Sequence, residues 1–450
     1  MSQEAQMSVT PFDSPMMRDL LSDKELAGLF TDQAEVRAIL LFEGALARAQ
    51  GKLGLIPELS GEAIHRAARE TAIDPSGLAA GTASAGVSIP ALVAQFREEM
   101  NAPEHAAFAH WGATSQDAAD TGQALRLKRL AAVLDARLAE IIAALGDAAE
   151  EHAELPMAAR TRAQIATPTT FGARVAAWGA PLIRARARLA RAAEGVALVS
   201  LAGASGNMAA MGAQAEEVAR LVGEELGLSV PALPWHAGRD GLAEFGAALA
   251  ILCGSLGKMG QDLVLLGQSE IGEVRAGEGG GSSTMPHKSN PVGAEALVAL
   301  ARHASRLSGG LQEALIFAGE RDGAAWQLEW MSLGQLCVAA GAATRHAQGL
   351  ARSLRPDGAR MLANMDATGG LMMAEAAMFA LAQAMPRPEA QALVKAACAT
   401  AVEQGAHLRA VLEERKEARG ADLGAAFDYS RHVGLAPVLA MRFAQMAREG

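Results

Sequence analysis

The chain has 450 residues, of which 50% are hydrophobic and only 4% aromatic, and its net charge is −10. Alanine and leucine dominate and favour helices, whereas the β-branched and aromatic runs that form strands are scarce, so we expect an all-α fold with a large core. The net negative charge and the absence of a basic stripe argue against nucleic acid and membrane partners. A small anionic substrate remains possible, because a few local cations in a pocket could bind it.

Helical periodicity is clear in the first hundred residues. A stripe with steps of three and four predicts a helix and consists of Ile39, Phe42, Leu46, Ala49 and Leu53. Asp32 with Glu35 is a candidate capping pair at its start, and Gly54 is a candidate stop.

Longer helices follow. A leucine and isoleucine stripe predicts a helix over residues 121–153, which ends at Leu155–Pro156. Similar patterns cover residues 171–194, 207–226, 240–272 and 291–317. Long helices with short breaks predict an up-and-down bundle over residues 113–360, between an N-terminal helical domain (1–112) and a C-terminal one (361–450).

Two uncharged stretches require a test against a membrane span. Residues 195–214 are rich in Gly and Ser, and residues 245–257 are apolar but too short to span a bilayer. We interpret both as helices buried on several sides. Residues 1–15 lack the apolar core of a signal peptide, which favours the cytoplasm.

The three cysteines, Cys253, Cys337 and Cys398, are widely spaced and follow no metal-binding pattern. We expect buried, reduced thiols.

The segment with the most chemistry covers residues 279–291. Three consecutive glycines at 279–281 permit backbone conformations that other residues resist, and they predict a mobile loop. The polar side chains that follow are those of Ser282, Ser283, His287, Lys288 and Asn290. Backbone N–H groups beside the glycines, together with the ammonium of Lys288, could bind an oxyanion.

This segment resembles the signature loop of the fumarase/aspartase superfamily, which reads G-S-S-x-M-P-x-K-x-N-P. The resemblance implies a helical subunit of three regions, a homotetramer whose active sites combine loops from three subunits, and no metal or cofactor. It also implies removal of a group β to a carboxylate through an aci-carboxylate carbanion. Ser282 would be the base, with Ser283 as the alternative, and Lys288 and Asn290 would hold the carboxylate that accepts the negative charge.

Two further segments resemble signatures of the same superfamily. In residues 110–117, Thr114 and Ser115 would donate hydrogen bonds to a substrate carboxylate, although a Ser/Thr pair here could also cap the following helix. In residues 160–168, Thr161 and Gln164 agree with the pattern G-R-T-H-x-Q, but Arg162 replaces its histidine.

The loss of this histidine favours the lactonising branch of the superfamily. In the lyases the histidine assists a poor leaving group, whereas a carboxylate, whose conjugate acid has a pKa of roughly 4, needs no such help. Arg162 could instead pair with one carboxylate of a tricarboxylate substrate. The alternative is a surface residue without contact to substrate.

Other segments resemble those of the bacterial 3-carboxy-cis,cis-muconate cycloisomerases. They are residues 86–93, 234–240 and 320–330, and they place His236 and Arg321 among the substrate-binding residues, together with His287 of the signature loop. The resemblance implies interconversion of 3-carboxy-cis,cis-muconate and its lactone, in the protocatechuate branch of the β-ketoadipate pathway. Departures at Val87, Arg162, Ser289 and Gly319 leave the exact substrate open.

Two alternatives remain. An adenylosuccinate lyase-like or other β-eliminating enzyme of the superfamily would need the histidine that Arg162 replaces. A non-catalytic structural descendant would not need Ser282, Lys288 and Asn290, which are all present.

Overall fold

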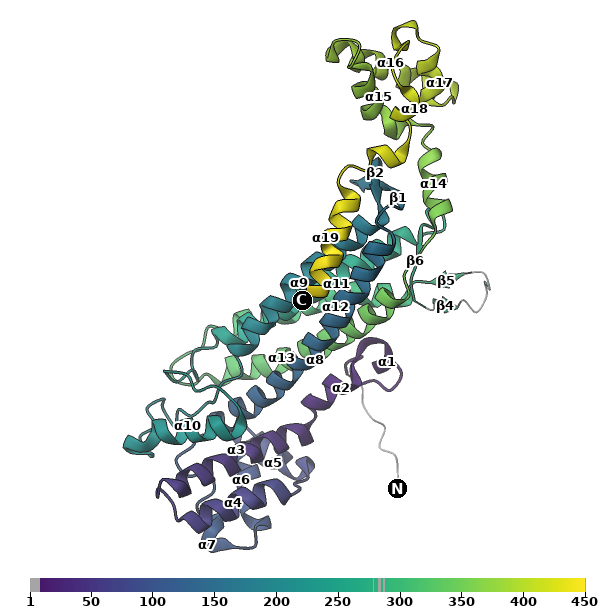
Figure 1. Cartoon of the computed structure of the whole chain (residues 1–450). Coiled ribbons are helices and arrows are strands. Elements are labelled where there is room, and N and C mark those ends of the chain that lie inside the picture. Colours follow the sequence, from purple (N-terminus) through teal and green to yellow (C-terminus); the bar gives the residue numbers. More distant parts are fainter. Residues whose placement is uncertain (1–8, 278, 282–284, 286–287, 450) are drawn as a thin grey trace. The chain divides into compact units, whose positions relative to one another are not determined.

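The computed structural model describes residues 9–277, 279–281, 285 and 288–449, and within them the chain is mainly helical with little strand, as predicted (Figure 1). It divides into two compact units. The first consists of residues 1–137, 185–254 and 299–345, and the second of residues 138–184, 255–298 and 346–450. The division falls within long helices, so each unit contains segments of several of them.

Four of the long helices agree with the predicted ranges to within six residues, but the helix predicted over 207–226 begins eight residues later, and the helix over 323–352 had no predicted range of its own. The bounds of the long helices are α8 (Ser115–Glu151), α9 (Phe171–Glu194), α10 (Ala215–Leu226), α11 (Asp240–Leu266), α12 (Val292–Glu313) and α13 (Gly323–Arg352). Close approach of these helices depends on small residues. In the first unit a Cβ on Gly246 of α11 would lie 2.3 Å from Leu311 of α12, and in the second a Cβ on Gly260 would lie 2.7 Å from the Ala294 carbonyl oxygen.

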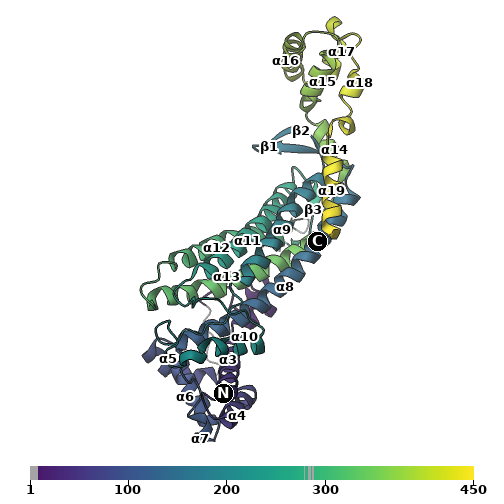
Figure 2. The same cartoon turned by 60° about the vertical axis from the view of Figure 1, so that its left-hand side comes forward.

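The N-terminal part of the first unit begins with two short helices and continues with helices that share one core with α10 and the start of α8. It contains α1 (Arg18–Leu21), α2 (Lys24–Ala27), α3 (Asp32–Lys52), α4 (Glu58–Glu70), α5 (Ala79–Ala85), α6 (Ile89–Glu99) and α7 (Pro103–Ala106), and α3, α4 and α6 lie together in both views (Figure 2). Phe42, Leu46, Ile64 and Phe96 are fully buried there. The cap of α3 is Thr31, whose hydroxyl accepts from the Ala34 N–H, and not Asp32 as expected.

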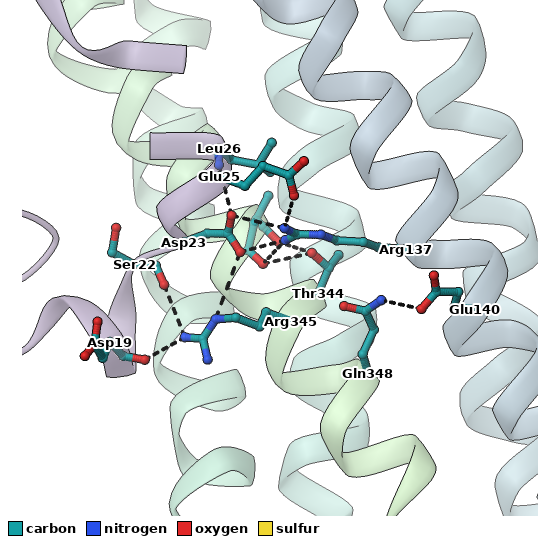
Figure 3. A network of polar contacts seen from close by, with 12 residues as sticks. Asp19, Ser22, Asp23, Glu25, Leu26, Arg137, Glu140, Thr344, Arg345 and Gln348 are labelled. Carbon is teal, nitrogen blue, oxygen red and sulfur yellow. Dashed lines mark hydrogen bonds and ion pairs between the residues drawn. The ribbon is translucent and has the colours of Figure 1, made fainter. Parts of the chain in front are cut away.

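An ion-pair network fixes the N-terminal segment of the first unit. Figure 3 shows Asp23 between two guanidinium groups, 2.7 Å from Arg137 and 4.0 Å from Arg345. Asp23 also accepts from the Leu26 N–H at the start of α2. Burial raises the pKa of Asp23, but the hydrogen bonds and charges of the two arginines outweigh it and hold that pKa below its usual value.

The stretch 195–214 is not a helix, contrary to the prediction. It forms turns and extended segments that end in a short 3₁₀ turn, Gly212–Gln214. Gly203 and Gly206 have φ of +69° and +84°, and the backbone N–H groups of Ala202 and Gly203 donate to the Asp117 carboxylate at 2.7 and 3.0 Å. This stretch lacks charged side chains because its small residues make their contacts through backbone N–H groups.

The second uncharged stretch, 245–257, lies within α11 as predicted. Among the described residues α11 is the one helix long and apolar enough to cross a membrane by length and composition, and half of its apolar window is buried. Phe245, Leu249, Leu252 and Leu256 are all fully buried. A core helix passes the same test, and this burial agrees with the predicted core position.

The second unit combines helix segments with short antiparallel ribbons. Its strands are β1 (Pro156–Thr161) paired with β2 (Gln164–Thr170), β3 (Val274–Arg275) with β6 (Arg355–Pro356), and β4 (Gly280–Gly281) with β5 (Ser289–Asn290). Its later helices are α14 (Gly358–Asp366), α15 (Ala374–Leu381), α16 (Arg387–Gln404), α17 (Leu408–Glu413), α18 (Leu423–Ala426) and α19 (Ala436–Glu449). α15 to α18 enclose a separate small core, and α19 packs on α9, where Phe443 occupies the space beside Gly179.

All three cysteines are free thiols, with Cys253 and Cys337 buried and Cys398 half-buried. The thiols are therefore reduced as expected, but only two of them are fully buried. The division into three domains at residues 112 and 360 stays a prediction.

Candidate active site

The predicted site residues fall into two sets, one in each compact unit. Thr114, Ser115, His236 and Arg321 belong to the first unit. The second unit holds Thr161, Arg162, Gln164, Lys288 and Asn290. Ser282, Ser283 and His287 lie outside the described residues.

Thr114 and Ser115 stand at the beginning of α8, where both are half-buried. The Asp117 carboxylate accepts from the Thr114 N–H at 3.0 Å, and the Thr114 carbonyl accepts from the Asp117 N–H at 3.0 Å. Burial raises the pKa of Asp117 to about 6, although three backbone N–H groups oppose this shift. Asp117 therefore fixes the turn, which leaves both hydroxyls available for a ligand.

The segment before this turn is attached to α3. Glu43, whose side chain is 1% exposed, contacts Nδ1 of His110 at 2.6 Å, and Gln50 donates to the Trp111 carbonyl at 2.7 Å. His110 has a left-handed φ of +61°, which is uncommon for a residue other than glycine. Burial lowers the pKa of His110, but Glu43 and Asp117 outweigh it and hold that pKa above its usual value.

Gln116 connects three parts of the first set, and the sequence analysis missed it. Its Nε2 donates to the His236 carbonyl at 2.7 Å and to Asp120 at 3.2 Å, and its Oε1 accepts from Nε of Arg321 at 2.9 Å. One signal was available, because Gln116 and Asp120 extend the buried stripe of α8 toward Leu127. Two polar residues on an otherwise apolar stripe indicate an internal polar network.

A buried ion triad fixes the segment that contains His236. Arg239, 1% exposed, donates to Asp120 at 2.7 Å and to Glu329 at 2.6 Å, and its guanidinium stacks on the Trp235 ring. Burial raises the pKa of Glu329 against the effect of Arg239. Since Arg239 lies three residues after His236, the triad fixes that segment to α8 and α13.

The imidazole of His236 is buried, yet neither ring nitrogen has a hydrogen-bond partner among the described residues. Its ring lies against Gly206, where a Cβ would come within 2.5 Å of Cε1. Burial, and then the charge of Arg321, lower the pKa of His236, so the ring is neutral at pH 7. A buried donor and acceptor without partners are available to a ligand.

In the second unit, Thr161, Arg162 and Gln164 form the tip of the β1–β2 hairpin. Thr161 pairs with Gln164 across a loop of two residues, Arg162 and Ala163, whose φ values are +51° and +65°. Two left-handed residues are the pattern of a type I′ turn, which favours Asn-Gly, so Arg-Ala is strained there. The Arg162 side chain is exposed at the tip, which agrees with either a substrate contact or the surface role weighed above.

The base of this hairpin is held by an ion pair that the sequence did not predict. Arg160 donates to both oxygens of Glu273, at 2.8 and 2.6 Å, and Glu273 is fully buried. Asn364 donates to the same carboxylate at 2.8 Å. Because Glu273 directly precedes β3, the pair fixes the hairpin to the segment that leads into the glycine-rich loop.

That loop is closed at its neck by β4 and β5. Gly280 pairs with Asn290 and Gly281 with Ser289. Gly279 has a φ of +70°, and a Cβ there would lie 1.9 Å from Oγ of Ser289. Lys288 is exposed and Asn290 half-buried, so both side chains flank the neck.

Comparison with known proteins identifies the family. Residues 18–305 match a family model described as lyase, and residues 370–443 match one described as adenylosuccinate lyase C-terminus. The chain belongs to the fumarase/aspartase lyase family. The all-α fold and the family resemblance predicted from the sequence are thereby confirmed.

Individual members of this lyase family are similar over nearly the whole chain. A 3-carboxy-cis,cis-muconate cycloisomerase of Pseudomonas aeruginosa is 41% identical over 420 residues, which cover 91% of this chain and 92% of that protein. A nitrosuccinate lyase of Streptomyces davaonensis is 34% identical over 96% of this chain and 94% of its own. The crystal structure of a 3-carboxy-cis,cis-muconate lactonizing enzyme from Pseudomonas putida superposes with a TM-score of 0.93 at 37% identity, covering 97% and 99% of the two chains.

Proposed function

We infer that this lyase is a cycloisomerase that interconverts 3-carboxy-cis,cis-muconate and its lactone. One observation carries the inference: relatives with this activity in their names are up to 41% identical over about nine-tenths of the chain. The replacement of the usual histidine by Arg162 supports it, because loss of a carboxylate needs no acid catalyst. As predicted from the sequence, the cycloisomerase is favoured over the other lyases.

In the cyclising direction one substrate carboxylate attacks the alkene carbon β to a second carboxylate. The electron pair of the alkene moves onto the second carboxylate, which Lys288 and Asn290 stabilise as an aci-carboxylate. Ser282 then delivers its hydroxyl proton to the α carbon and is reprotonated from solvent. In the reverse direction Ser282 or its neighbour Ser283 removes that proton, and the ring carboxylate departs.

We propose that residues of both sets bind substrate. Thr114, Ser115 and Arg321 would bind one carboxylate, and Thr161, Arg162 and Gln164 another. The neutral imidazole of His236 has a donor and an acceptor to offer a ring oxygen or a carboxylate. We also propose that His287 binds substrate, because it lies in the signature loop.

We further propose a cytoplasmic homotetramer that shares its active sites between subunits and serves aromatic catabolism through the protocatechuate branch. Large hydrophobic side chains on the long helices support an interface, since Ile251, Leu265, Trp330 and Met331 are each more than 40% exposed. Light scattering after gel filtration should give a mass four times that of the chain. A monomer at micromolar concentration would contradict this assembly.

A second candidate is another β-eliminating lyase of the same family. The match of residues 370–443 to the adenylosuccinate lyase C-terminus and the 34% identity to a nitrosuccinate lyase favour it. Release of fumarate from adenylosuccinate or nitrosuccinate, measured beside lactone formation, separates the two functions.

The main test follows the absorbance of the conjugated diene of 3-carboxy-cis,cis-muconate. We expect wild-type enzyme to remove this absorbance and Ser282→Ala to lose at least about 10²-fold in kcat with an unchanged melting temperature. Ser305→Ala, an exchange of an exposed serine on α12 outside the signature loop, is the matched control. Near-normal turnover by Ser282→Ala would refute the role of Ser282, and a wild-type enzyme without activity on this substrate would refute the function.

A further inference from the structure

Gln116 has an unusual position for a residue without assigned chemistry. Its side chain is completely buried, and its amide makes three hydrogen bonds to groups far apart in the sequence. They are the Arg321 guanidinium, the His236 carbonyl and the Asp120 carboxylate. A buried amide with its oxygen and its nitrogen both bonded is a rigid connector.

Arg321 depends on this connector for its direction. Its side chain is exposed, and its Nε donates to Oε1 of Gln116 at 2.9 Å. Nη1 makes only a long contact, 3.4 Å, to the Ala204 carbonyl. The guanidinium edge that carries Nη2 has no hydrogen-bond partner within the described part of the chain, so it is open to a ligand.

The groups that bind Arg321 are uncharged, and this affects how strongly Arg321 can bind an anion. Arg239, nearby, is bound by the two carboxylates of Asp120 and Glu329, which neutralise its charge. Arg321 is bound only by a neutral amide and a carbonyl, and no described carboxylate forms an ion pair with it. A neutral acceptor fixes the guanidinium and leaves its full charge for an incoming anion.

We propose that Gln116 is a positioning residue, which aims Arg321 at a substrate carboxylate and holds the His236 segment beside it. The proposal rests on the proposed function, in which Arg321 binds a carboxylate next to Thr114 and Ser115. Gln116 is the immediate neighbour of Ser115, so one residue sets the spacing between the two hydroxyls and the cation. Gln116 also binds the backbone carbonyl of the neutral His236, whose ring nitrogens lack partners among the described residues.

The experiment is a double-mutant cycle in the muconate assay, with Gln116→Met, Arg321→Met and the double variant. A carboxylate contact made equally in the ground and transition states affects KM alone. We therefore expect Gln116→Met to raise KM about tenfold and to change kcat by less than about threefold. In the Arg321→Met background the same exchange should change KM by less than about twofold, because the Arg239 triad still fixes the His236 segment and the remaining effect passes through Arg321.

Gln312→Met is the matched control. It also replaces a glutamine that donates to a backbone carbonyl, that of Ala243 at 3.2 Å, but it has no contact with Arg321. Equal KM values for Gln116→Met and wild type, or independent effects of the two substitutions in the cycle, would overturn the positioning role.

A second variant serves if Gln116→Met does not fold. Gln116→Glu retains the acceptor for Nε, but it places an anion beside the guanidinium and removes the donor to Asp120 and to the His236 carbonyl. KM should therefore rise at least about threefold, and a wild-type KM would overturn the proposal. A wild-type enzyme without turnover on 3-carboxy-cis,cis-muconate would instead refute the proposed function, and the positioning role with it.

Discussion

The neck of the glycine-rich loop offers the most direct perturbation of catalysis through backbone structure. Gly279, Gly280 and Gly281 are identical in chemistry but differ in their surroundings. A Cβ on Gly279 would lie 1.9 Å from Oγ of Ser289, and one on Gly280 would lie 2.5 Å from Cγ2 of Val292. A Cβ on Gly281 would meet no described atom within 4 Å.

The magnitude follows from the Gly279 backbone. Its φ of +70° lies in the left-handed region, which costs an alanine roughly 1–2 kcal/mol. Rotation of the Ser289 hydroxyl removes the clash at little further cost, because Oγ is the end of a small side chain. A destabilisation of about 1–2 kcal/mol lowers the population of the closed neck about 5- to 30-fold relative to open forms.

We therefore expect Gly279→Ala to lower kcat about 5- to 30-fold in the diene assay, with little change in melting temperature, since the neck can open without global unfolding. Gly281→Ala should lose less than about threefold. If both variants have the same kcat, closure of the neck through Gly279 does not support catalysis and the reasoning fails.

Three further predictions concern stability and reactivity. Asp23→Asn should lower the free energy of unfolding by about 3 kcal/mol in urea, because it leaves the guanidinium of Arg137 without its buried carboxylate. Since the folded-state pKa of Asp23 is depressed, this stabilisation is fully present above the ordinary carboxyl pKa of about 4 and is lost as pH falls from there through the lower folded-state pKa. An equal loss of unfolding free energy at pH 3 and pH 7 would contradict the pairing. Ala163→Gly should raise the free energy of unfolding by about 1 kcal/mol, because glycine accepts the φ of +65° without strain; a lower melting temperature would contradict the type I′ turn. A thiol reagent should modify Cys398 first in the native protein, since burial raises the pKa of Cys253 to about 12 and also raises that of Cys337; rapid modification of either buried thiol would argue against this core.

Helix positions could be predicted wherever an apolar stripe reaches the helix ends. α9 has the expected bounds because its stripe begins at Phe171, directly after the strand. α8 starts at Ser115, six residues before the prediction, because its first turn is polar and binds other segments. The stretch 195–214 was assigned wrongly because absence of charge was taken for burial of a helix, although Gly203 and Gly206 interrupt any helical stripe.

The site could be predicted only where its residues form short patterns. Thr114, Ser115 and Lys288 follow from such patterns, and their positions at a helix start and at a loop neck suit the roles proposed for them. Gln116 and Glu273 act through partners 205 and 113 residues away, so no local pattern contains the interaction. What the sequence did contain was a polar residue on a buried stripe, which indicates a network but does not name its partner.

The central claim is that a serine hydroxyl delivers a proton to the carbon next to a carboxylate while a second carboxylate closes the lactone ring. Turnover of 3-carboxy-cis,cis-muconate in D₂O, followed by ¹H NMR of the product, tests this claim most directly. The account predicts a lactone from the wild-type enzyme with one deuterium on the carbon α to the carboxylate, in a single configuration, and no lactone from Ser282→Ala. Lactone formed at the wild-type rate by Ser282→Ala, or a product without deuterium at that carbon, would contradict it.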